Sequence, residues 1–416
     1  MSRKDRRSIE DQQVSDLVGE GFNRRDFLDL LAKGGMLAAG MAALPNLARS
    51  MVSEDGVVKI GYLPITDATA LLVAHGKGFL EEEGLKVERP TLIRGWSPLV
   101  EGFASGKFNL VHFLKPIPVW MRYNNDFPVK IMAWAHTNGS GLVVGKHTSI
   151  EDFAGLAGSQ IAVPYWYSMH NIVLQIALRA NGLKAVIKPQ GTKLAPNEVN
   201  LQVMPPPEMP AALAAKKIDA YIVAEPFNAM GEVKAGARML RFTGDIWKNH
   251  PCCVVCMHEG DAEKNPEWTQ KVMNGIVKAQ IYTSTHKEEV AEMLSRDGKG
   301  YLPMPAKVVK RAMTLYSSEP SYEESGAIKH AAWGNGRIDF QPWPYPSATK
   351  MIVNAMNETV VDGDKTFLSK LDPDFVAKDL VNYEFVRNAL EKYPEWKNDP
   401  SVNPADPFNR EEVVLL

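Results

Sequence analysis

Two short stretches of the sequence hold most of the side chains that could bind a ligand. The first runs from Tyr165 to His170 and combines aromatic rings, a hydroxyl group and an imidazole. Ser168 is a good N-cap for a helix that starts at Met169, so His170 would lie in the first turn, where unpaired backbone N–H groups favour an anion. The imidazole can therefore donate to a bound anion, or it can be satisfied by a neighbouring carbonyl group.

The second stretch runs from His250 to His258 and contains all three cysteines of the chain. Cysteines this close together cannot form the disulfide framework of a small secreted protein. On a strand, one face would carry four nitrogen and sulfur ligands that suit zinc or another soft metal, namely His250, Cys252, Cys256 and His258. Ligands along one strand seldom converge on one ion, and buried cysteine acts as a small hydrophobe. We therefore predict no metal and no cofactor, and keep Cys252, Cys256 and His258 as secondary candidates.

Composition and motifs exclude several functions. The chain has 416 residues, with 47 Lys and Arg against 49 Asp and Glu, which gives a formal net charge of -2. This balance provides no basic field for nucleic acid or for an anionic membrane. The sequence also lacks a nucleophile elbow, a P-loop, a zinc-protease motif and a dinucleotide-binding fingerprint. We expect a protein that is not an enzyme and that does not bind nucleic acid.

Short apolar runs alternate with helical periods from Val57 onward, which predicts an α/β fold. The predicted strands are Val57 to Leu63, Leu85 to Leu92, Leu110 to Phe113, Gln160 to Val163, Val199 to Val203, Ala220 to Ala224 and Cys252 to Met257. Helix starts are predicted at Thr66 or Asp67 and at Ser97-Pro98. Ligands of open α/β sheets bind beyond the carboxyl ends of the strands. The candidate binding residues at such places are Thr66, Asp67, Trp96, Ser97, Lys115, Ser140, Tyr165, His170 and Glu225.

An internal repeat indicates two lobes built from equivalent units. Residues 103–111 resemble residues 213–221 in character, and in the same alignment Lys115-Pro116 falls over Glu225-Pro226. Two such lobes would form a clamshell with facing strand ends. Lys115 and Glu225 then either meet across the cleft, or select a solute by its charge, or remain solvated.

The N-terminal residues resemble an export signal. Arg24-Arg25 precedes Phe27-Leu28, and a weakly apolar run rich in Gly and Ala follows from Gly34 to Ala43. Paired arginines in this context are typical of the twin-arginine route, and the run is too short for a spanning helix. We predict a signal peptide at residues 1–48 and a periplasmic location.

Several segments together resemble a known family. They are Gly61 to Asp67, Lys77 to Phe79, Gly95 to Ser97, Val111-His112, Pro116 to Pro118, Tyr167 to Asn171, Met204 to Met209, Glu225 to Ala229, Asp245 to Trp247 and His250-Pro251. They are similar to periplasmic solute-binding proteins of ATP-driven importers in the nitrate, sulfonate and bicarbonate group, most of all to the nitrate and bicarbonate branch. The resemblance implies a type II periplasmic binding fold, a clamshell of two α/β lobes that closes on a small, anionic solute such as nitrate, a sulfonate, bicarbonate or cyanate. It also implies a membrane permease and its ATPase subunit as partners.

The resemblance gives a domain plan and two site residues. Residues 49–143 would form the first part of lobe 1, residues 144–245 lobe 2, and residues 246–416 the rest of lobe 1 with C-terminal helices packed on it. The family's tryptophan and histidine at the anion correspond to Trp96 and His170. Where nitrate-binding members have a glutamine and a lysine, this chain has Ser140 and Cys253. We therefore consider the hypothesis that Lys115 supplies the missing positive charge.

Two alternatives stay open. The same fold could bind a neutral aromatic or pyrimidine solute between Tyr165, Trp166 and Trp96. It also resembles metal-dependent pyrimidine synthases of thiamine biosynthesis, which use a histidine and a cysteine-rich motif, here represented by Cys252, Cys253 and Cys256. The export signal and the different cysteine spacing argue against that enzyme.

Overall fold

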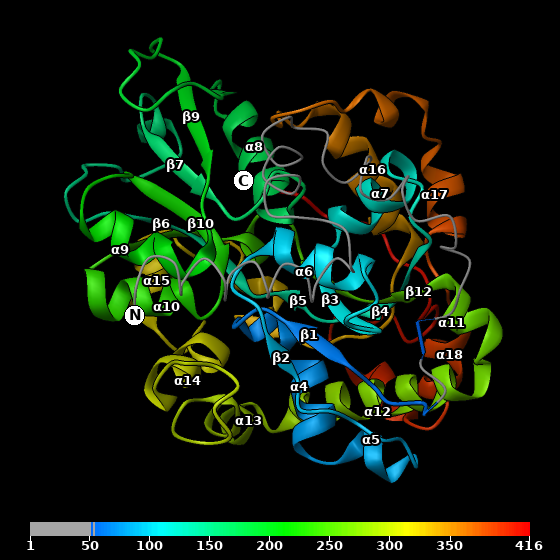
Figure 1. Ribbon diagram of the computed structural model, residues 1–416. Helices are drawn as coiled ribbons and strands as arrows, with labels where there is room; N and C mark the ends of the chain where they lie inside the picture. The colour runs from blue at the N-terminus through cyan, green and yellow to red at the C-terminus, as the bar shows by residue number, and fades with distance from the viewer. Residues whose placement is uncertain (1–50, 53–54) are drawn as a thin grey trace, which may run out of the picture.

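The computed structural model describes residues 51–52 and 55–416, so the predicted signal peptide at 1–48 lies outside the described residues. Two twisted β-sheets form the centres of two lobes, and helices cover both (Figure 1). Among the residues that the structure describes, no helix is both long enough and apolar enough to cross a membrane.

The first sheet contains strands from both halves of the chain. Its order is β2 (Thr91–Leu92), β1 (Ile60–Tyr62), β3 (Leu110–Leu114), β12 (Cys253–His258) and β4 (Val129–Trp134). Strand β1 pairs in parallel with β2 and β3, whereas β12 pairs antiparallel with both β3 and β4. The carboxyl ends of β1, β3 and β4 therefore meet the amino end of β12 at one edge of the sheet.

Helices from distant parts of the sequence cover the first sheet. The long helix α12 (Pro266–Thr285) packs on α4 (Thr69–Gly76), α5 (Phe79–Glu82) and α18 (Glu384–Leu390), as the lower right of Figure 1 shows. Helix α6 (Trp96–Ala104) packs on β1 and β3, and α7 (Pro116–Asn124) packs on β3 and β4. The rings of Phe103, Phe113 and Phe127 meet edge to face in this core.

The second sheet is formed by one continuous part of the chain. Its order is β11 (Arg238–Phe242), β6 (Ser140–Val144), β10 (Ala220–Ala224), β7 (Gln160–Val163), β9 (Glu198–Val203) and β8 (Lys184–Val186). Strands β10, β7, β9 and β8 run in parallel, and β6 runs antiparallel to β10 and β11. Helices α8 (Met169–Ala180), α9 (Met209–Ala214) and α10 (Phe227–Met230) connect these strands.

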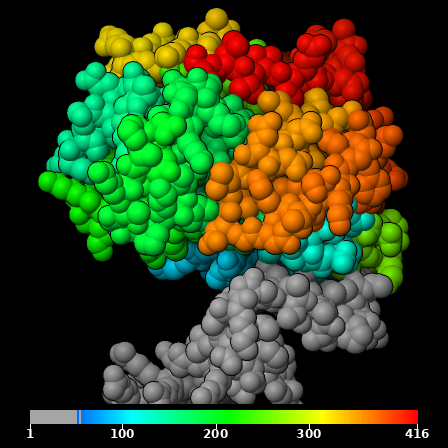
Figure 2. All heavy atoms as spheres, turned by 90° about the horizontal axis from the view of Figure 1, so that it is seen from above, coloured from blue at the N-terminus to red at the C-terminus, as the bar shows by residue number. Residues whose placement is uncertain are grey.

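The C-terminal segments touch both lobes, which is a wider contact than the predicted packing on lobe 1. Helix α14 (Ala306–Thr314) packs on α13 (Lys287–Leu294) and on α10 of the second lobe. Helix α16 (Pro346–Glu358) packs on α17 (Pro373–Asp379), on α7 and on α8. In Figure 2 the orange surface of this segment lies directly against the green surface of the second lobe.

Hydrogen bonds fix the C-terminal segment to the second lobe and to the connection between the sheets. The side-chain amide of Gln175 donates to the Val360 carbonyl at 2.9 Å, and the Val360 amide donates to the Gln175 carbonyl oxygen at 2.8 Å. At the end of the chain, the Lys248 amide donates to the Val413 carbonyl, and the Leu415 amide donates to the Ile246 carbonyl, each at 2.9 Å. The two lobes are therefore joined by more than their crossing strands.

Most predicted elements are present, and two differ for local reasons. Helix α6 begins at Trp96 with Gly95 as its N-cap residue, and no side chain caps it. Ser97 is inside the helix, and its hydroxyl lies beside Tyr165 instead. The predicted strand at Leu85 to Leu92 is reduced to Thr91–Leu92, because Pro90 cannot donate a ladder hydrogen bond and the segment lies at the edge of the sheet.

Candidate functional site

Strand topology brings polar residues together where the two lobes meet. Asp67 follows β1, His136 follows β4, Cys252 precedes β12 and Cys253 is its first residue, so all four lie at the shared edge of the first sheet. The second lobe contributes Ser140, which starts β6, and His170, which lies in the first turn of α8. We call these six residues the junction cluster.

The junction cluster is closed from solvent and tightly connected. Each of its six side chains is buried, with at most 2% of the residue surface exposed. Asp67 Oδ2 lies 3.0 Å from His136 Nε2, 3.2 Å from Cys253 Sγ and 3.7 Å from Cys252 Sγ. Cys252 Sγ also lies 3.6 Å from Ser140 Oγ and 3.9 Å from His170 Nε2, which links the two lobes.

Burial and mutual contact shift the protonation of these groups. Burial raises the pKa of Asp67, against the effect of His136. Burial disfavours a charged His136, but the Asp67 carboxylate outweighs it and raises the pKa of His136 to about 10. Burial also opposes ionisation of Cys252, yet the Cys253 thiol and the nearby histidines hold the pKa of Cys252 well below its usual range. The Asp67 carboxylate and the His136 imidazole therefore favour each other's charged form, whereas burial opposes both charges.

Local backbone geometry sets the position of His136. Gly139 has φ +78°, a conformation that favours glycine, and a Cβ atom there would lie 3.0 Å from the His136 ring. Asn138, with φ 59°, forms the same turn, and its amide donates to the His250 carbonyl at 3.0 Å. The turn thus holds His136 in the cluster and leads the chain into β6.

His170 and Trp96 present unused polar atoms near this junction. Ser168 caps α8 as predicted, because its hydroxyl accepts from the Asn171 amide at 3.1 Å. His170 Nε2 is 2.9 Å from Ser140 Oγ, while its Nδ1 has no partner in the described part of the chain. Trp96 packs edge-on against His112, with ring centres 5.6 Å apart, and its indole N–H has no partner within residues 51–52 and 55–416. Both side chains are at most 3% exposed, so these are buried polar atoms whose hydrogen-bonding capacity is not used in this structure.

Four further predicted residues bridge the two lobes. The backbone amide and the hydroxyl of Thr66 donate to the Glu225 carbonyl at 2.8 and 3.1 Å. Ser97 of the first lobe interacts with Tyr165 of the second, where burial raises the pKa of the phenol. Contacts of this kind across the junction indicate that the structure represents a closed state.

Lys115 and Glu225 are not brought together, so the idea that they meet across the cleft is wrong for this closed state. The Lys115 ammonium donates to Thr349 Oγ1 of α16 at 2.8 Å, and burial lowers its pKa to about 7. Glu225 pairs with Arg337 at 2.6 Å and accepts from the Ala229 amide at 3.0 Å. Both side chains are buried, which also excludes the solvated alternative.

The three secondary metal candidates are also separated. Cys256 lies in the middle of β12 near Lys115. Burial raises the pKa of its thiol well above the usual range, and Lys115 offsets only part of this rise. The His258 Nδ1 accepts from the Gly260 amide at 3.0 Å and so caps α11 (Glu259–Lys264). A strand rises about 3.3 Å per residue, so Cys252 and His258 are roughly 20 Å apart along it. Only Cys252 of the three belongs to the junction cluster.

The sequence interpretation missed His136 and Arg337. His136 follows an apolar strand-like run, Val129 to Trp134, so the rule of strand carboxyl ends would have selected it. Arg337 lies in an irregular segment that carries no motif, and only the tertiary fold shows that it pairs with Glu225 and Glu232.

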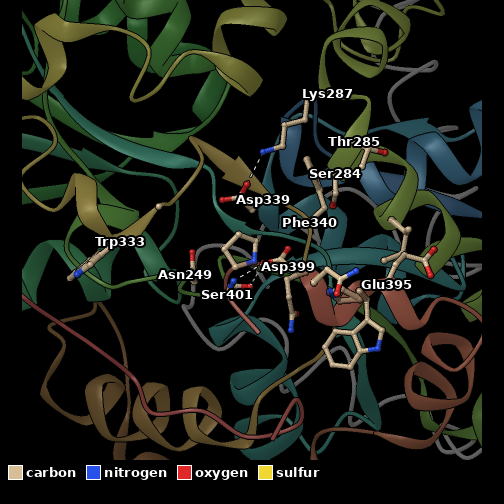
Figure 3. A pocket seen from close by; sticks show the side chains of 17 residues that line it. Asn249, Ser284, Thr285, Lys287, Trp333, Asp339, Phe340, Glu395, Asp399 and Ser401 are labelled. Atoms are coloured by element: carbon tan, nitrogen blue, oxygen red, sulfur yellow. Dashed lines mark hydrogen bonds and ion pairs between the residues drawn. The ribbon is translucent and has the colours of Figure 1, made fainter. Parts of the chain in front are cut away.

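A separate pocket of about 420 Å³ lies away from these residues. It is lined by parts of α12, α13 and β13 (Ile338–Asp339) together with the segment at 395–401. Figure 3 shows the ion pair of Lys287 with Asp339, whose charged atoms are 2.6 Å apart, and the hydrogen bond that the Ser401 hydroxyl donates to Asp399. None of the predicted binding residues lines this pocket, so we do not assign the solute to it.

Comparison with known proteins agrees with the two-lobed fold. The chain is 28% identical over 333 residues to the nitrate/nitrite binding protein NrtA of Nostoc sp. PCC 7120, which covers 74% of this chain and 72% of that protein. It is 26% identical to the bicarbonate transport ATP-binding protein CmpC of Synechocystis sp. PCC 6803, over 57% of this chain and only 37% of that protein. The crystal structure of the periplasmic nitrate-binding protein NrtA from Synechocystis PCC 6803 matches with a TM-score of 0.67 and 18% identity, over 85% of this chain and 91% of that one.

The family model for the NMT1-like family matches residues 52–295, which is more than half of the chain. The matched range contains the first sheet, the second sheet and every residue of the junction cluster. The chain therefore belongs to the NMT1-like family.

Proposed function

We propose that this protein is the substrate-binding component of an ATP-driven importer and is not an enzyme. It binds a small, anionic solute between the lobes and delivers it to a membrane permease that works with an ATPase subunit. The similar NrtA proteins bind nitrate and nitrite, according to their names, and the similar CmpC protein belongs to bicarbonate transport.

The arrangement of His170, Ser140 and Trp96 is the observation that carries the proposal. His170 and Ser140 belong to the second lobe and Trp96 to the first, so a solute between them would contact both lobes only when they close. The N-terminus of α8 favours negative charge, and the Trp96 indole N–H is an unused donor. Because these contacts form only on closure, the solute binds the closed state more tightly than the open state. This difference in affinity shifts the population to the closed state.

The periplasm and the twin-arginine route are part of this proposal, because Arg24-Arg25 and the following Gly/Ala run have the features of an export signal.

A thermal-shift screen followed by calorimetry tests the proposal. The mature protein, from about residue 49, is heated with nitrate, nitrite, bicarbonate, cyanate, taurine and short alkanesulfonates, and with neutral pyrimidines as the alternative class. A solute that binds only the native state adds ~2.7 kcal/mol of stability at 100 times its Kd, so one oxyanion is expected to raise Tm by a few degrees.

Matched histidine variants then locate the solute. His170→Gln should weaken binding of the active oxyanion by at least about tenfold, which is the loss of ~1.4 kcal/mol. The control is His286→Gln, because His286 is exposed and lies next to α13. A shift only with neutral pyrimidines, or equal affinities of the two variants, would contradict the proposal. Turnover of a pyrimidine precursor would contradict the non-enzyme assignment.

A further inference from the structure

Asp67 has unusual partners for a fully buried carboxylate. Asp245, which is equally buried, accepts backbone N–H groups from Lys329 and His330 at 2.9 and 2.7 Å. Among the described residues, Asp67 accepts no backbone N–H group, and its Oδ1 has no partner. Its Oδ2 faces an imidazole nitrogen and two thiol sulfurs instead. These three groups are metal ligands, whereas thiols are weak hydrogen-bond donors.

The four groups have the size of a tetrahedral coordination shell. Asp67 Oδ2, a His136 ring nitrogen, Cys252 Sγ and Cys253 Sγ lie within 4.8 Å of one another. Zinc bonds of about 2.0 to 2.3 Å place tetrahedral ligand atoms roughly 3.3 to 3.8 Å apart. The carboxylate distances of 3.0, 3.2 and 3.7 Å are close to this range. Because the largest separation in the set is below 4.8 Å, shifts of no more than about 1 Å would bring all four atoms into this range.

The ligand set comes from one lobe and is covered by the other. Asp67, His136, Cys252 and Cys253 surround the edge of the first sheet, whereas Ser140 and His170 belong to the second lobe. The first lobe alone therefore holds all four ligands, and an ion can enter while the lobes are apart. On closure, Ser140 and His170 lie over Cys252 at 3.6 and 3.9 Å and exclude water.

We propose that Asp67, His136, Cys252 and Cys253 form a binding site for one divalent cation of the zinc type. Two thiolates, one imidazole and one carboxylate favour zinc and its spectroscopic substitute cobalt over calcium or magnesium, which prefer oxygen ligands alone. The site does not depend on the proposed solute, because all four ligands lie in the first lobe and none is His170 or Trp96.

Cobalt titration of the reduced, metal-free mature protein, with any affinity tag removed, tests the site. One equivalent of Co²⁺ should give the intense visible bands of tetrahedral cobalt and a near-ultraviolet band from thiolate ligands, and one equivalent of Zn²⁺ should remove both. Cys252→Ser and Cys253→Ser should each lose about half of the thiolate band, and Asp67→Asn should weaken the affinity for Zn²⁺ at least about tenfold.

Cys256→Ser is the matched control, because Cys256 is equally buried on the same strand but lies outside the ligand set. It should leave the cobalt spectrum and the zinc affinity unchanged. Near-ultraviolet circular dichroism of each metal-free variant shows whether it is folded, and a folded Cys253→Ser with the full wild-type spectrum would overturn the proposal. So would a wild-type protein without tetrahedral cobalt bands. Nitrate binding by a protein that does not bind cobalt would overturn the metal site and leave the proposed function standing.

Discussion

Lys115 and Glu225 occupy equivalent places in the two lobes, but their surroundings differ. Lys115 follows β3 and Glu225 follows β10, as the internal repeat indicates. The Lys115 ammonium has a neutral partner, Thr349, whereas the Glu225 carboxylate has a charged one, Arg337. Both partners come from the C-terminal part of the chain, which lies outside the repeat. Equivalent positions in a duplicated fold can therefore acquire opposite electrostatic environments from segments that are not duplicated.

The largest expected effect is on the Glu225 side of this comparison. Arg337→Ala leaves the buried Glu225 carboxylate without its cation, and breaking such a pair costs about 3–5 kcal/mol. The measurement is guanidinium-induced unfolding at pH 7. The control is Arg311→Ala, because Arg311 pairs with Glu232 at 3.0 Å but is 28% exposed at its side chain, so its loss should cost much less. If both variants lose the same free energy of unfolding, burial of the Glu225–Arg337 pair adds nothing to its contribution to stability.

The Lys115 side should respond to pH. Burial lowers the pKa of Lys115 from 10.5 to about 7, so between these values the unfolded chain binds the proton and the folded one does not. Stability of the wild type relative to Lys115→Met should therefore rise with pH from about 7 to 10.5, by an amount on the order of several kcal/mol. Unfolding midpoints of both proteins across this range test the sign. Parallel pH curves would contradict a buried, neutral amine.

A smaller effect is expected at the partner of Lys115. Thr349→Val removes the oxygen that accepts from the ammonium at 2.8 Å, and an unpartnered buried donor costs about 1–3 kcal/mol. Thr349→Ser keeps the oxygen and is the control. In the Lys115→Met background, the loss of stability caused by Thr349→Val should nearly vanish. A loss that is the same in both backgrounds would mean that Thr349 acts through packing alone.

The smallest expected effect concerns solute binding. The Lys115 ammonium donates to Thr349 of α16, so we expect that it does not supply the charge that the sequence interpretation assigned to it. Lys115→Met should change the Kd for nitrate or bicarbonate, whichever stabilises the wild type, by less than about twofold. Isothermal titration calorimetry checks this. A tenfold loss would restore the compensation hypothesis.

Local signals predicted the elements well, and they predicted the site in part. The helix start at Met169 and the bounds of the strands Gln160–Val163 and Ala220–Ala224 are as predicted, because caps and apolar runs act within a few residues. The roles of Trp96 and His170 stay a prediction. The contact of Asp67 with Cys253 joins residues 186 positions apart, and it depends on where β12 enters the first sheet. No local pattern contains that information.

The place of β12 between β3 and β4 also constrains the order of folding. All strands of the second sheet lie between residues 140 and 242, so that lobe can be completed while the rest of the chain is still being synthesised. The first sheet cannot close until residue 258 has left the ribosome, although four of its five strands are made first. Until then β3 and β4 lack their shared neighbour and present unpaired edges, which are prone to aggregation. The lobe that is begun first is therefore finished last.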